Sequence, residues 1–291
     1  ILIMKNASKS SRDNKKVYIF LFVVLLLILL FLGYLCFKYL LYEEITPDTE
    51  PPTENTQIGN EPIEKEQEPQ DEISEEPEGP IYTEESPLVD GQQAYVVVPS
   101  QIYLDEPATI VMYSHGSTGI ITDDFSSKYM SELRDFAIQF PEYNYIFAAS
   151  NQHGQNWGNE DSIQDIVNLK DWIDERYPTT KEMYLIGFSM GGLPTMNYAS
   201  RYPDTVSKIV LLAPTIYSSE WDQQRANRVK DMDIKIWHGT SDVNIPISYS
   251  TYFVNKVLPY GLEIPLEKLE GKTHFDIDRE YVDEIIRFFN S

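Results

Sequence analysis

Cysteine and histidine are scarce in this sequence, with one cysteine, Cys36, and four histidines among 291 residues. A single cysteine cannot close a disulfide within the chain. The histidines and the cysteine also show none of the spacings of a metal site, such as H-E-x-x-H or paired C-x-x-C. We therefore expect no internal disulfide, no metal and no other cofactor.

Basic residues are also few, because 23 Lys and Arg residues face 46 Asp and Glu residues, which gives a formal net charge of −23. Phosphate contacts require a basic surface, so this balance disfavours a nucleic-acid partner. The basic charge that is present gathers near the N-terminus, where residues 1–16 hold five Lys and Arg residues. This segment is predicted to be a basic cytoplasmic tail.

A long uncharged stretch follows the basic tail. Residues 17–37 are twenty-one uncharged residues, of which seventeen are Leu, Ile, Val or Phe. At about 1.5 Å per residue, a helix of this length covers the roughly 30 Å hydrocarbon core of a bilayer. We therefore predict a transmembrane helix over residues 17–42. A cleaved signal peptide is the alternative, but its apolar region usually has only about 7 to 15 residues.

The charges on either side of the predicted span indicate its orientation. Basic residues precede the span and an acidic run follows it, so the positive-inside rule places the N-terminus in the cytoplasm. The rest of a single-pass protein of the plasma membrane would then be extracellular. The membrane is thus an expected partner, contacted through the N-terminal helix.

The acidic run over residues 43–87 holds sixteen acidic residues and eight prolines against one Lys. With few apolar side chains, such a segment cannot bury a core, and we predict a disordered linker. Like charges and prolines extend a chain, so at up to about 3.1 Å per residue the linker could reach on the order of 100 Å from the bilayer. A solvated spacer is favoured over an acidic binding tail.

From residue 88 to residue 291, short apolar runs alternate with segments of helical periodicity. Continuous apolar runs are typical of strands covered on both faces. The alternation therefore predicts an α/β fold, a mostly parallel sheet with helices on both faces. The predicted strands are residues 94–98, 109–113, 145–149, 183–186, 208–212, 234–237 and 266–269. The predicted helices are residues 126–140, 163–176, 193–201, 248–258 and 279–289.

The pentapeptide Gly187-Phe188-Ser189-Met190-Gly191 lies between a predicted strand and a predicted helix. A G-x-S-x-G sequence in this place is typical of a nucleophile elbow, a strained turn that lifts the serine hydroxyl above the sheet. The flanking glycines lack the Cβ atoms that would collide with neighbouring backbone. The pattern predicts Ser189 as the nucleophile, with an ordinary glycine-rich turn as the alternative.

An aspartate and then a histidine follow the elbow, each just after a predicted strand. These are Asp242 and His274. A serine hydroxyl becomes nucleophilic when a histidine takes its proton, and an aspartate can orient that histidine. We therefore predict a Ser189-His274-Asp242 triad. Asp276 and Asp278 are alternative acids, but they come after the histidine in the chain.

These motifs and their order resemble the α/β-hydrolase superfamily over essentially all of residues 88–291. Residues 110–117, Ile-Val-Met-Tyr-Ser-His-Gly-Ser, are similar to the family's strand that ends in His-Gly. In the family, the next residue usually lends a backbone N–H to the oxyanion hole. The resemblance thus implies Ser117 as one donor, and the elbow geometry implies the backbone N–H of Met190 as the second.

The other histidines have structural interpretations. We interpret His115 as a residue that supports the oxyanion loop, and His238 as a strand-end residue that bonds nearby backbone. His153 and Trp157 lie in a polar loop that borders the active site in this fold. Trp157 is a possible residue of the substrate cleft, with packing inside the loop as the alternative. Only residues 217–232 leave room for a cap, so we expect a shallow or open pocket.

The combined prediction is a membrane-anchored, outward-facing serine hydrolase. The favoured activity is that of a carboxylesterase, which cleaves a small-molecule or polymer-borne ester through an acyl-enzyme intermediate. One alternative is a peptidase that resembles the single-domain relatives of prolyl oligopeptidase, because the same triad cleaves amides. Another is a catalytically inactive surface domain that keeps the fold and only binds.

Overall fold

The computed structural model describes residues 80–102, 106–277 and 280–291. The predicted cytoplasmic tail, the predicted transmembrane helix over residues 17–42 and most of the predicted linker lie outside these described residues. Within the described residues, no helix combines the length and the apolar character that crossing a membrane requires.

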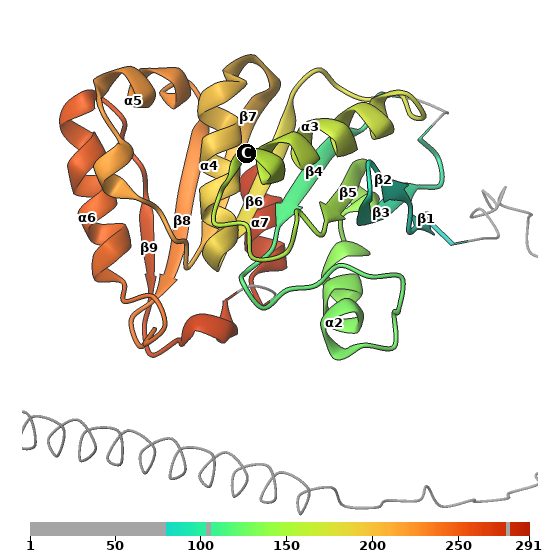
Figure 1. The fold of residues 1–291 in the computed structure, drawn as a ribbon, viewed down its shortest axis with the longest axis horizontal. Helices are drawn as coiled ribbons and strands as arrows, with labels where there is room; N and C mark the ends of the chain where they lie inside the picture. The colour runs from blue at the N-terminus through green and yellow to red at the C-terminus, as the bar shows by residue number, and fades with distance from the viewer. Residues whose placement is uncertain (1–79, 103–105, 278–279) are drawn as a thin grey trace, which may run out of the picture. The chain divides into compact units, whose positions relative to one another are not determined.

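A single nine-stranded sheet organises the described residues, as Figure 1 shows. Its strands are β1 (Tyr82–Glu85), β2 (Leu88–Val89), β3 (Gln92–Pro99), β4 (Thr109–Ser114), β5 (Tyr145–Ser150), β6 (Met183–Phe188), β7 (Val206–Leu212), β8 (Asp233–Gly239) and β9 (Leu266–Leu269). They lie in the order β1-β3-β5-β4-β6-β7-β8-β9, and β2 pairs with β3 outside this path.

Most of the sheet is parallel. β3 pairs in antiparallel fashion with β1, β2 and β5, whereas the neighbours from β5 across to β9 are all parallel. The carboxyl ends of the parallel strands therefore meet at one edge of the sheet. Ligands of such sheets bind at this edge. The predicted mostly parallel α/β sheet is confirmed.

Helices cover both faces of the sheet. They are α2 (Lys128–Ala137), α3 (Glu160–Asp174), α4 (Gly192–Arg201), α5 (Gln223–Val229), α6 (Ser248–Val257) and α7 (Val282–Phe289). α3, α4, α5 and α6 lie on one face, and α2 and α7 lie on the other (Figure 1). Side chains cap the starts of α2, α3 and α5; the Asn159 side chain, for example, accepts a hydrogen bond from the Ser162 backbone N–H at the start of α3.

Alternate side chains of the strands enter two separate hydrophobic clusters. Ile110 and Met112 of β4 pack on the face with α3 to α6, and Val111 and Tyr113 pack on the face with α2 and α7. Each side chain of this kind contributes about 1.5 to 3 kcal/mol when it is fully buried. Burial on both faces explains why the central strands are mostly apolar and do not alternate regularly between apolar and polar residues.

β1 corrects one predicted boundary. The sequence predicts a disordered linker through residue 87, but β1 begins at Tyr82 and pairs with β3. The reason lies far along the chain: the Glu84 carboxylate accepts two bonds of 2.7 Å from Arg134 and one of 2.8 Å from the Tyr95 hydroxyl. The Arg134 bonds lower the pKa of Glu84. Glu84, an acidic residue that the sequence assigns to the linker, is therefore part of an edge strand paired with β3.

The segment over residues 217–232 contains α5, at the place where the sequence leaves room for a cap. Ala226 and Val229 of α5 are buried in the hydrophobic cluster that α3, α4 and α6 share. α5 is thus part of the helical layer on this face of the sheet.

Candidate active site

Ser189 follows β6 in a single 3-10 turn, Ser189–Gly191, that leads directly into α4. Its φ of 54° lies in the left-handed region, which costs a residue other than glycine about 1 to 3 kcal/mol. The glycines on either side allow the turn to pack closely. A Cβ on Gly191 would lie 2.0 Å from the Ser114 carbonyl oxygen, and one on Gly187 would lie 2.7 Å from Thr195 Oγ1.

The structure brings the three residues of the predicted triad into one chain of contacts. His274 Nε2 lies 2.9 Å from Ser189 Oγ, and His274 Nδ1 lies 2.7 Å from Asp242 Oδ2. All three residues are at least nine-tenths buried. Because a carboxylate only accepts hydrogen bonds, Nδ1 carries the hydrogen and Nε2 is left to accept the serine proton.

The Asp242 carboxylate is held by the turn in which it lies. Its Oδ1 accepts hydrogen bonds of 2.8 Å from the backbone N–H groups of Asn244 and Ile245. Its Oδ2 is therefore the oxygen that faces His274. Two backbone donors of the same turn thus hold Oδ1 in place.

His274 opens a 3-10 turn, His274–Asp276, that has its own cap. The Asp276 carboxylate accepts hydrogen bonds from the Thr273 backbone N–H at 2.8 Å and from the Thr273 hydroxyl at 2.7 Å. These bonds lower the pKa of Asp276. Asp276, considered above as an alternative acid, thus caps the turn that carries the histidine, and Asp278 lies outside the described residues.

The loops that carry the acid and the histidine pack tightly against each other. A Cβ on Gly239 would lie 2.1 Å from the Lys272 carbonyl oxygen, so only glycine fits there. The same carbonyl oxygen accepts a hydrogen bond of 3.0 Å from the Ser241 backbone N–H. Thr240 Oγ1 accepts another, of 2.9 Å, from the backbone N–H of Gly271. The two loops therefore form a single interlocked unit.

The segment predicted to supply an oxyanion donor lies beside Ser189. A Cβ on Gly116 would lie 3.3 Å from Ser189 Cβ and 3.1 Å from the Phe188 ring. Ser117 follows directly and lines the same cavity as Ser189. Met190, the other predicted donor, begins the step from Ser189 into α4 and is fully buried.

His115 lies below this segment, as its structural interpretation requires. Its side chain is fully buried, with Nδ1 2.7 Å from the Gly116 carbonyl oxygen and Nε2 2.9 Å from the Asn151 carbonyl oxygen. The ring therefore joins the loop after β4 to the loop after β5.

Ser189 and His274 open onto a cavity of about 360 Å³. Trp157, Phe188 and Phe275 supply aromatic surface, and the described lining contains no Asp, Glu, Lys or Arg. Phe188 and Phe275 also line an adjoining cavity of about 290 Å³, where Lys128 and Glu132 are the charged residues. Residues 217–232 line neither cavity. No sequence pattern predicts a role for Phe188 or Phe275, although each is the chain neighbour of a residue of the predicted triad.

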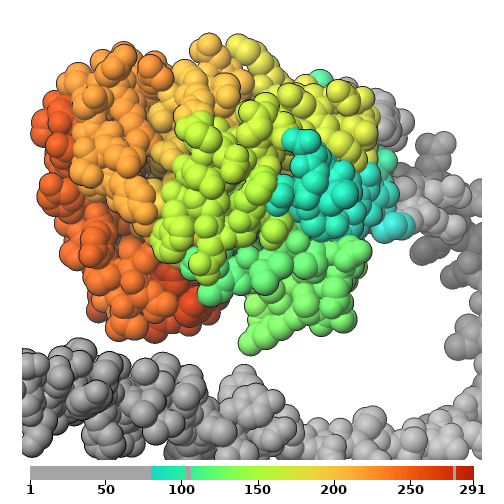
Figure 2. Space-filling view, viewed as in Figure 1, coloured from blue at the N-terminus to red at the C-terminus, as the bar shows by residue number. Residues whose placement is uncertain are grey.

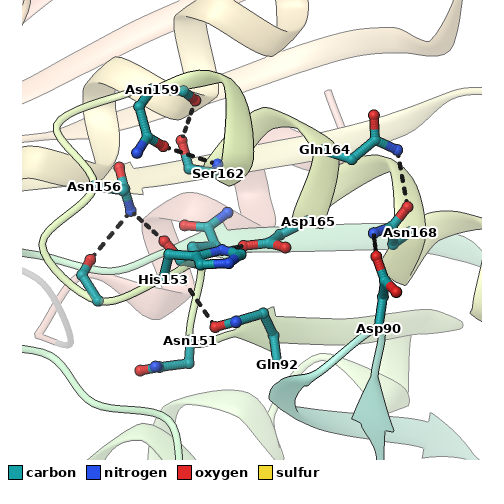
Figure 3. Close-up of polar contacts among 12 residues, drawn as sticks. Asp90, Gln92, Asn151, His153, Asn156, Asn159, Ser162, Gln164, Asp165 and Asn168 are labelled. Atoms are coloured by element: carbon teal, nitrogen blue, oxygen red, sulfur yellow. Dashed lines mark hydrogen bonds and ion pairs between the residues drawn. The ribbon is translucent and has the colours of Figure 1, made fainter.

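Trp157 reaches the cavity from a polar loop between β5 and α3, which Figure 3 shows in detail. The loop is strained: Gln152, His153 and Trp157 have φ values of 45°, 58° and 48°. Asn156 holds it from inside, since its amide group donates to the Gln152 carbonyl oxygen at 3.0 Å and its Oδ1 accepts from the Gly158 backbone at 2.8 Å. These hydrogen bonds therefore hold the backbone of the loop that carries the Trp157 indole.

His153 anchors the same loop to α3. His153 Nδ1 lies 2.7 Å from Asp165 Oδ2, and the His153 backbone N–H donates to the Gln92 side chain at 3.0 Å (Figure 3). Burial raises the pKa of Asp165, and the His153 contact opposes this rise. Figure 2 shows the yellow-green chain of this loop and α3 on the surface. His153 lines neither cavity and acts as a support.

Comparison with known proteins agrees with this description. Residues 147–237 match a protein family described as serine aminopeptidase, S33. Homoserine O-acetyltransferase of Corynebacterium glutamicum is 35% identical over 71 residues, which are 23% of this chain and 19% of that enzyme. The matched stretch is thus about a fifth of that relative's length.

Two solved structures extend the similarity to the whole fold. A thermostable esterase superposes with a TM-score of 0.56 at 18% identity, over 72% of this chain and 63% of that chain. Est1E from Butyrivibrio proteoclasticus superposes with a TM-score of 0.52 at 17% identity, over 72% of this chain and 97% of its own. Est1E has also been solved with ferulic acid bound.

The fold is therefore that of the α/β hydrolases. The match to the serine aminopeptidase family lies within this fold, over residues 147–237.

Proposed function

We propose that the described domain is an esterase that hydrolyses neutral esters through Ser189, His274 and Asp242. The observation that supports this most directly is the continuous contact from Ser189 Oγ to His274 and on to Asp242, on the wall of a cavity. Nucleophile, base and orienting acid are all within hydrogen-bonding distance in the structure, which is the arrangement that acyl transfer requires.

The proposed reaction proceeds in two halves. Ser189 Oγ attacks the ester carbonyl carbon while His274 Nε2 takes its proton, and the carbonyl oxygen gains negative charge. The backbone N–H groups of Ser117 and Met190 stabilise this charge, and one such donor contributes about 10²- to 10³-fold in rate. His274 then protonates the leaving alcohol, an acyl-enzyme remains, and a water activated by His274 releases the acid.

The cavity lining favours an ester over the substrate of an aminopeptidase. An aminopeptidase must bind the positively charged amino terminus of its substrate, and a charged group needs a paired partner when it leaves water. The described lining of the Ser189 cavity offers no carboxylate, whereas Trp157, Phe188 and Phe275 offer apolar surface. We infer that the substrate carries an aromatic or similarly flat apolar group, as the ferulic acid bound by Est1E does.

A fluorophosphonate probe tests this function on the full chain. We expect the probe to label the wild-type protein and not Ser189→Ala, and the wild type to hydrolyse p-nitrophenyl esters faster than proline-containing peptide anilides. Faster cleavage of the anilides would instead favour the peptidase. A folded wild-type protein that the probe does not label would favour a binding domain without activity.

We further propose that this domain is displayed outside the cell, on a single membrane span over residues 17–42 and a spacer that ends before β1. The charge asymmetry around residues 17–37 supports this orientation. An epitope tag at each end of the chain tests it. Protease added to intact cells should remove the C-terminal tag and spare the N-terminal one, and the reverse result would contradict the proposal.

A further inference from the structure

A second histidine, His238 of β8, lies against the Asp242 carboxylate. It is fully buried, with Nε2 2.7 Å from the Ile245 carbonyl oxygen and 3.3 Å from Asp242 Oδ2. On its other side, Nδ1 lies 2.8 Å from the hydroxyl of Ser250, a buried residue of α6. The carboxylate of Asp242 therefore faces two imidazole rings, and the proposed reaction uses only one.

The partners of His238 determine where its hydrogen lies. The Ile245 carbonyl oxygen can only accept, so Nε2 carries the hydrogen and donates it. Nδ1 is then free to accept the hydrogen of the Ser250 hydroxyl. Burial lowers the pKa of His238, which keeps the ring neutral and preserves this arrangement. Both ring nitrogens thus have defined hydrogen-bond roles, Nε2 as donor and Nδ1 as acceptor.

His238 and Asp242 hold Ile245 from two sides. The Ile245 backbone N–H donates to Asp242 Oδ1 at 2.8 Å, and its carbonyl oxygen accepts from His238 at 2.7 Å. If the His238 donor is lost, the carbonyl oxygen loses its partner and the turn that orients the carboxylate loses an anchor. Asp242 Oδ2 also loses the His238 N–H, whose nitrogen lies 3.3 Å away.

We propose that His238 is a positioning residue, which fixes the turn of residues 242–245 so that Asp242 Oδ2 points at His274 Nδ1. The proposal rests on the proposed function, because it assigns His238 a part in the same reaction. Ser250 in turn fixes the ring of His238. Contacts thus connect Ser250 of α6 through His238 of β8 to Asp242.

Two substitutions at this position separate the donor from the ring. In His238→Gln, the side-chain amide can place an N–H near the position of Nε2 and keep the bond to Ile245. In His238→Asn, the shorter amide reaches only the position of Nδ1. We expect kcat for a p-nitrophenyl ester to fall about 10- to 100-fold in His238→Asn, as misplaced catalytic groups do, with KM unchanged. His238→Gln should stay within about 3-fold of wild type.

Controls exclude a general loss of stability. Tyr145→Phe removes a hydrogen bond of 2.6 Å to Asn290 at the opposite edge of the sheet and should leave kcat unchanged. Equal losses of kcat in the Gln and Asn variants would overturn the proposal, as would an Asn variant with wild-type kcat. If His238→Asn does not fold, Ser250→Ala serves in its place. Its kcat should fall while its unfolding midpoint stays near that of Tyr145→Phe, and unchanged kcat would overturn the proposal.

A spectroscopic measurement separates this proposal from the proposed function. The Nδ1 proton that His274 shares with Asp242 should give a downfield proton NMR signal in the full chain, which His274→Gln identifies by its loss. We expect the signal to remain in His238→Gln and to shift or disappear in His238→Asn. An inactive wild type with this pattern would refute the esterase and keep the positioning role. An active wild type whose signal is the same in both variants would refute the positioning role alone.

Discussion

The two ends of the parallel strands use polar groups for different purposes. At the carboxyl ends, Ser189, Asp242 and His274 are buried side by side and their hydrogen bonds form one chain. At the amino ends, Lys208 and Tyr145 bond to the last residues of the chain, where Lys208 Nζ lies 2.6 Å from the Ser291 carbonyl oxygen. Buried polar groups hold a helix in place at one end and assemble the candidate active site at the other.

Backbone strain follows the same division. Seven described residues other than glycine have positive φ, and five of them follow the carboxyl ends of β5, β6 or β7: Gln152, His153, Trp157, Ser189 and Ala213. Such conformations cost about 1 to 3 kcal/mol each and persist only where the surrounding structure enforces them. The stability of the rest of the fold thus supports a strained edge, at which we place the proposed chemistry.

The largest effect should come from removing one charge at the carboxyl end. Asp242→Asn keeps the shape of the side chain but no longer holds His274 in the required tautomer, so kcat should fall about 10³- to 10⁴-fold. Lys208→Met is the matched change at the amino end and should leave kcat unchanged. Ester hydrolysis by both variants, with circular dichroism to confirm folding, tests the contrast. Equal losses of kcat in the two variants would contradict the proposed difference between the two ends of the strands.

A pair of glycines tests the packing of the same two ends. Gly191→Ala places a methyl group 2.0 Å from the Ser114 carbonyl oxygen, so the elbow must shift. The free energy of unfolding should therefore fall by at least about 3 kcal/mol. Gly261 lies before β9, where a Cβ would meet nothing within 4 Å. Gly261→Ala should therefore cost only about 1 kcal/mol, from its positive φ. Urea unfolding measures both, and similar costs would contradict the steric argument.

A change at the cavity wall should alter binding more than chemistry. Trp157→Ala removes aromatic surface that lines the cavity, so KM for a naphthyl ester should rise about 10-fold, the equivalent of about 1.4 kcal/mol. The kcat for that ester should stay within about 3-fold of wild type. Tyr143→Ala, which removes another exposed aromatic residue ahead of β5, is the control and should change neither constant. An unchanged KM in Trp157→Ala would remove the indole from the binding surface.

A smaller effect should come from the carboxyl group that anchors the Trp157 loop. Burial raises the pKa of Asp165 above its unfolded value of 3.8, so ionisation costs more in the folded domain than in the unfolded chain. The contribution of Asp165 to the free energy of unfolding is therefore fully present below pH 3.8 and declines as the pH rises through the folded pKa. Asp165→Asn lacks this decline, so its stability relative to wild type should increase with pH, by about 1.4 kcal/mol per unit of pKa difference. Urea unfolding at pH 4 and pH 7 measures it.

The smallest effect, of opposite sign, is expected at the edge strand. The pKa of Glu84 is lowered by its bonds to Arg134, so its contribution is present above the unfolded value of 4.5 and is lost as the pH falls through the folded pKa. Glu84→Gln should therefore destabilise the protein at pH 7, by less than about 1 kcal/mol because the pair is partly exposed to solvent. The difference should vanish in acid, and a loss that is independent of pH would exclude the charge as its cause.

Local patterns in the sequence predicted most of the parallel sheet and the elbow. Apolar runs placed strands such as residues 208–212, which the structure extends to Val206–Leu212. The helix predicted over residues 126–140 is α2, Lys128–Ala137, with Ser127 as its cap. These elements are predictable because burial on the sheet and capping leave their mark within a few adjacent residues.

The features that sequence patterns did not reveal depend on distant partners. β1 contains two consecutive glutamates, and the charge of Glu84 is paired with that of Arg134, fifty residues later. α5 is short, and its burial depends on helices that lie elsewhere in the chain. His238 could be placed at a strand end, but its two contacts with the turn of Asp242 depend on how residues 242–245 fold back. Sequence order indicates which residues can meet but not the network that supports them.

The close fit of Gly239 against the Lys272 backbone limits how this domain can be redesigned. An engineer who replaced the loop after β8 with that of a homologue would separate two surfaces shaped for each other, and the segment before His274 would have to be exchanged as well. Selection faces the same restriction. The two loops should therefore be inherited, swapped and redesigned as one cassette.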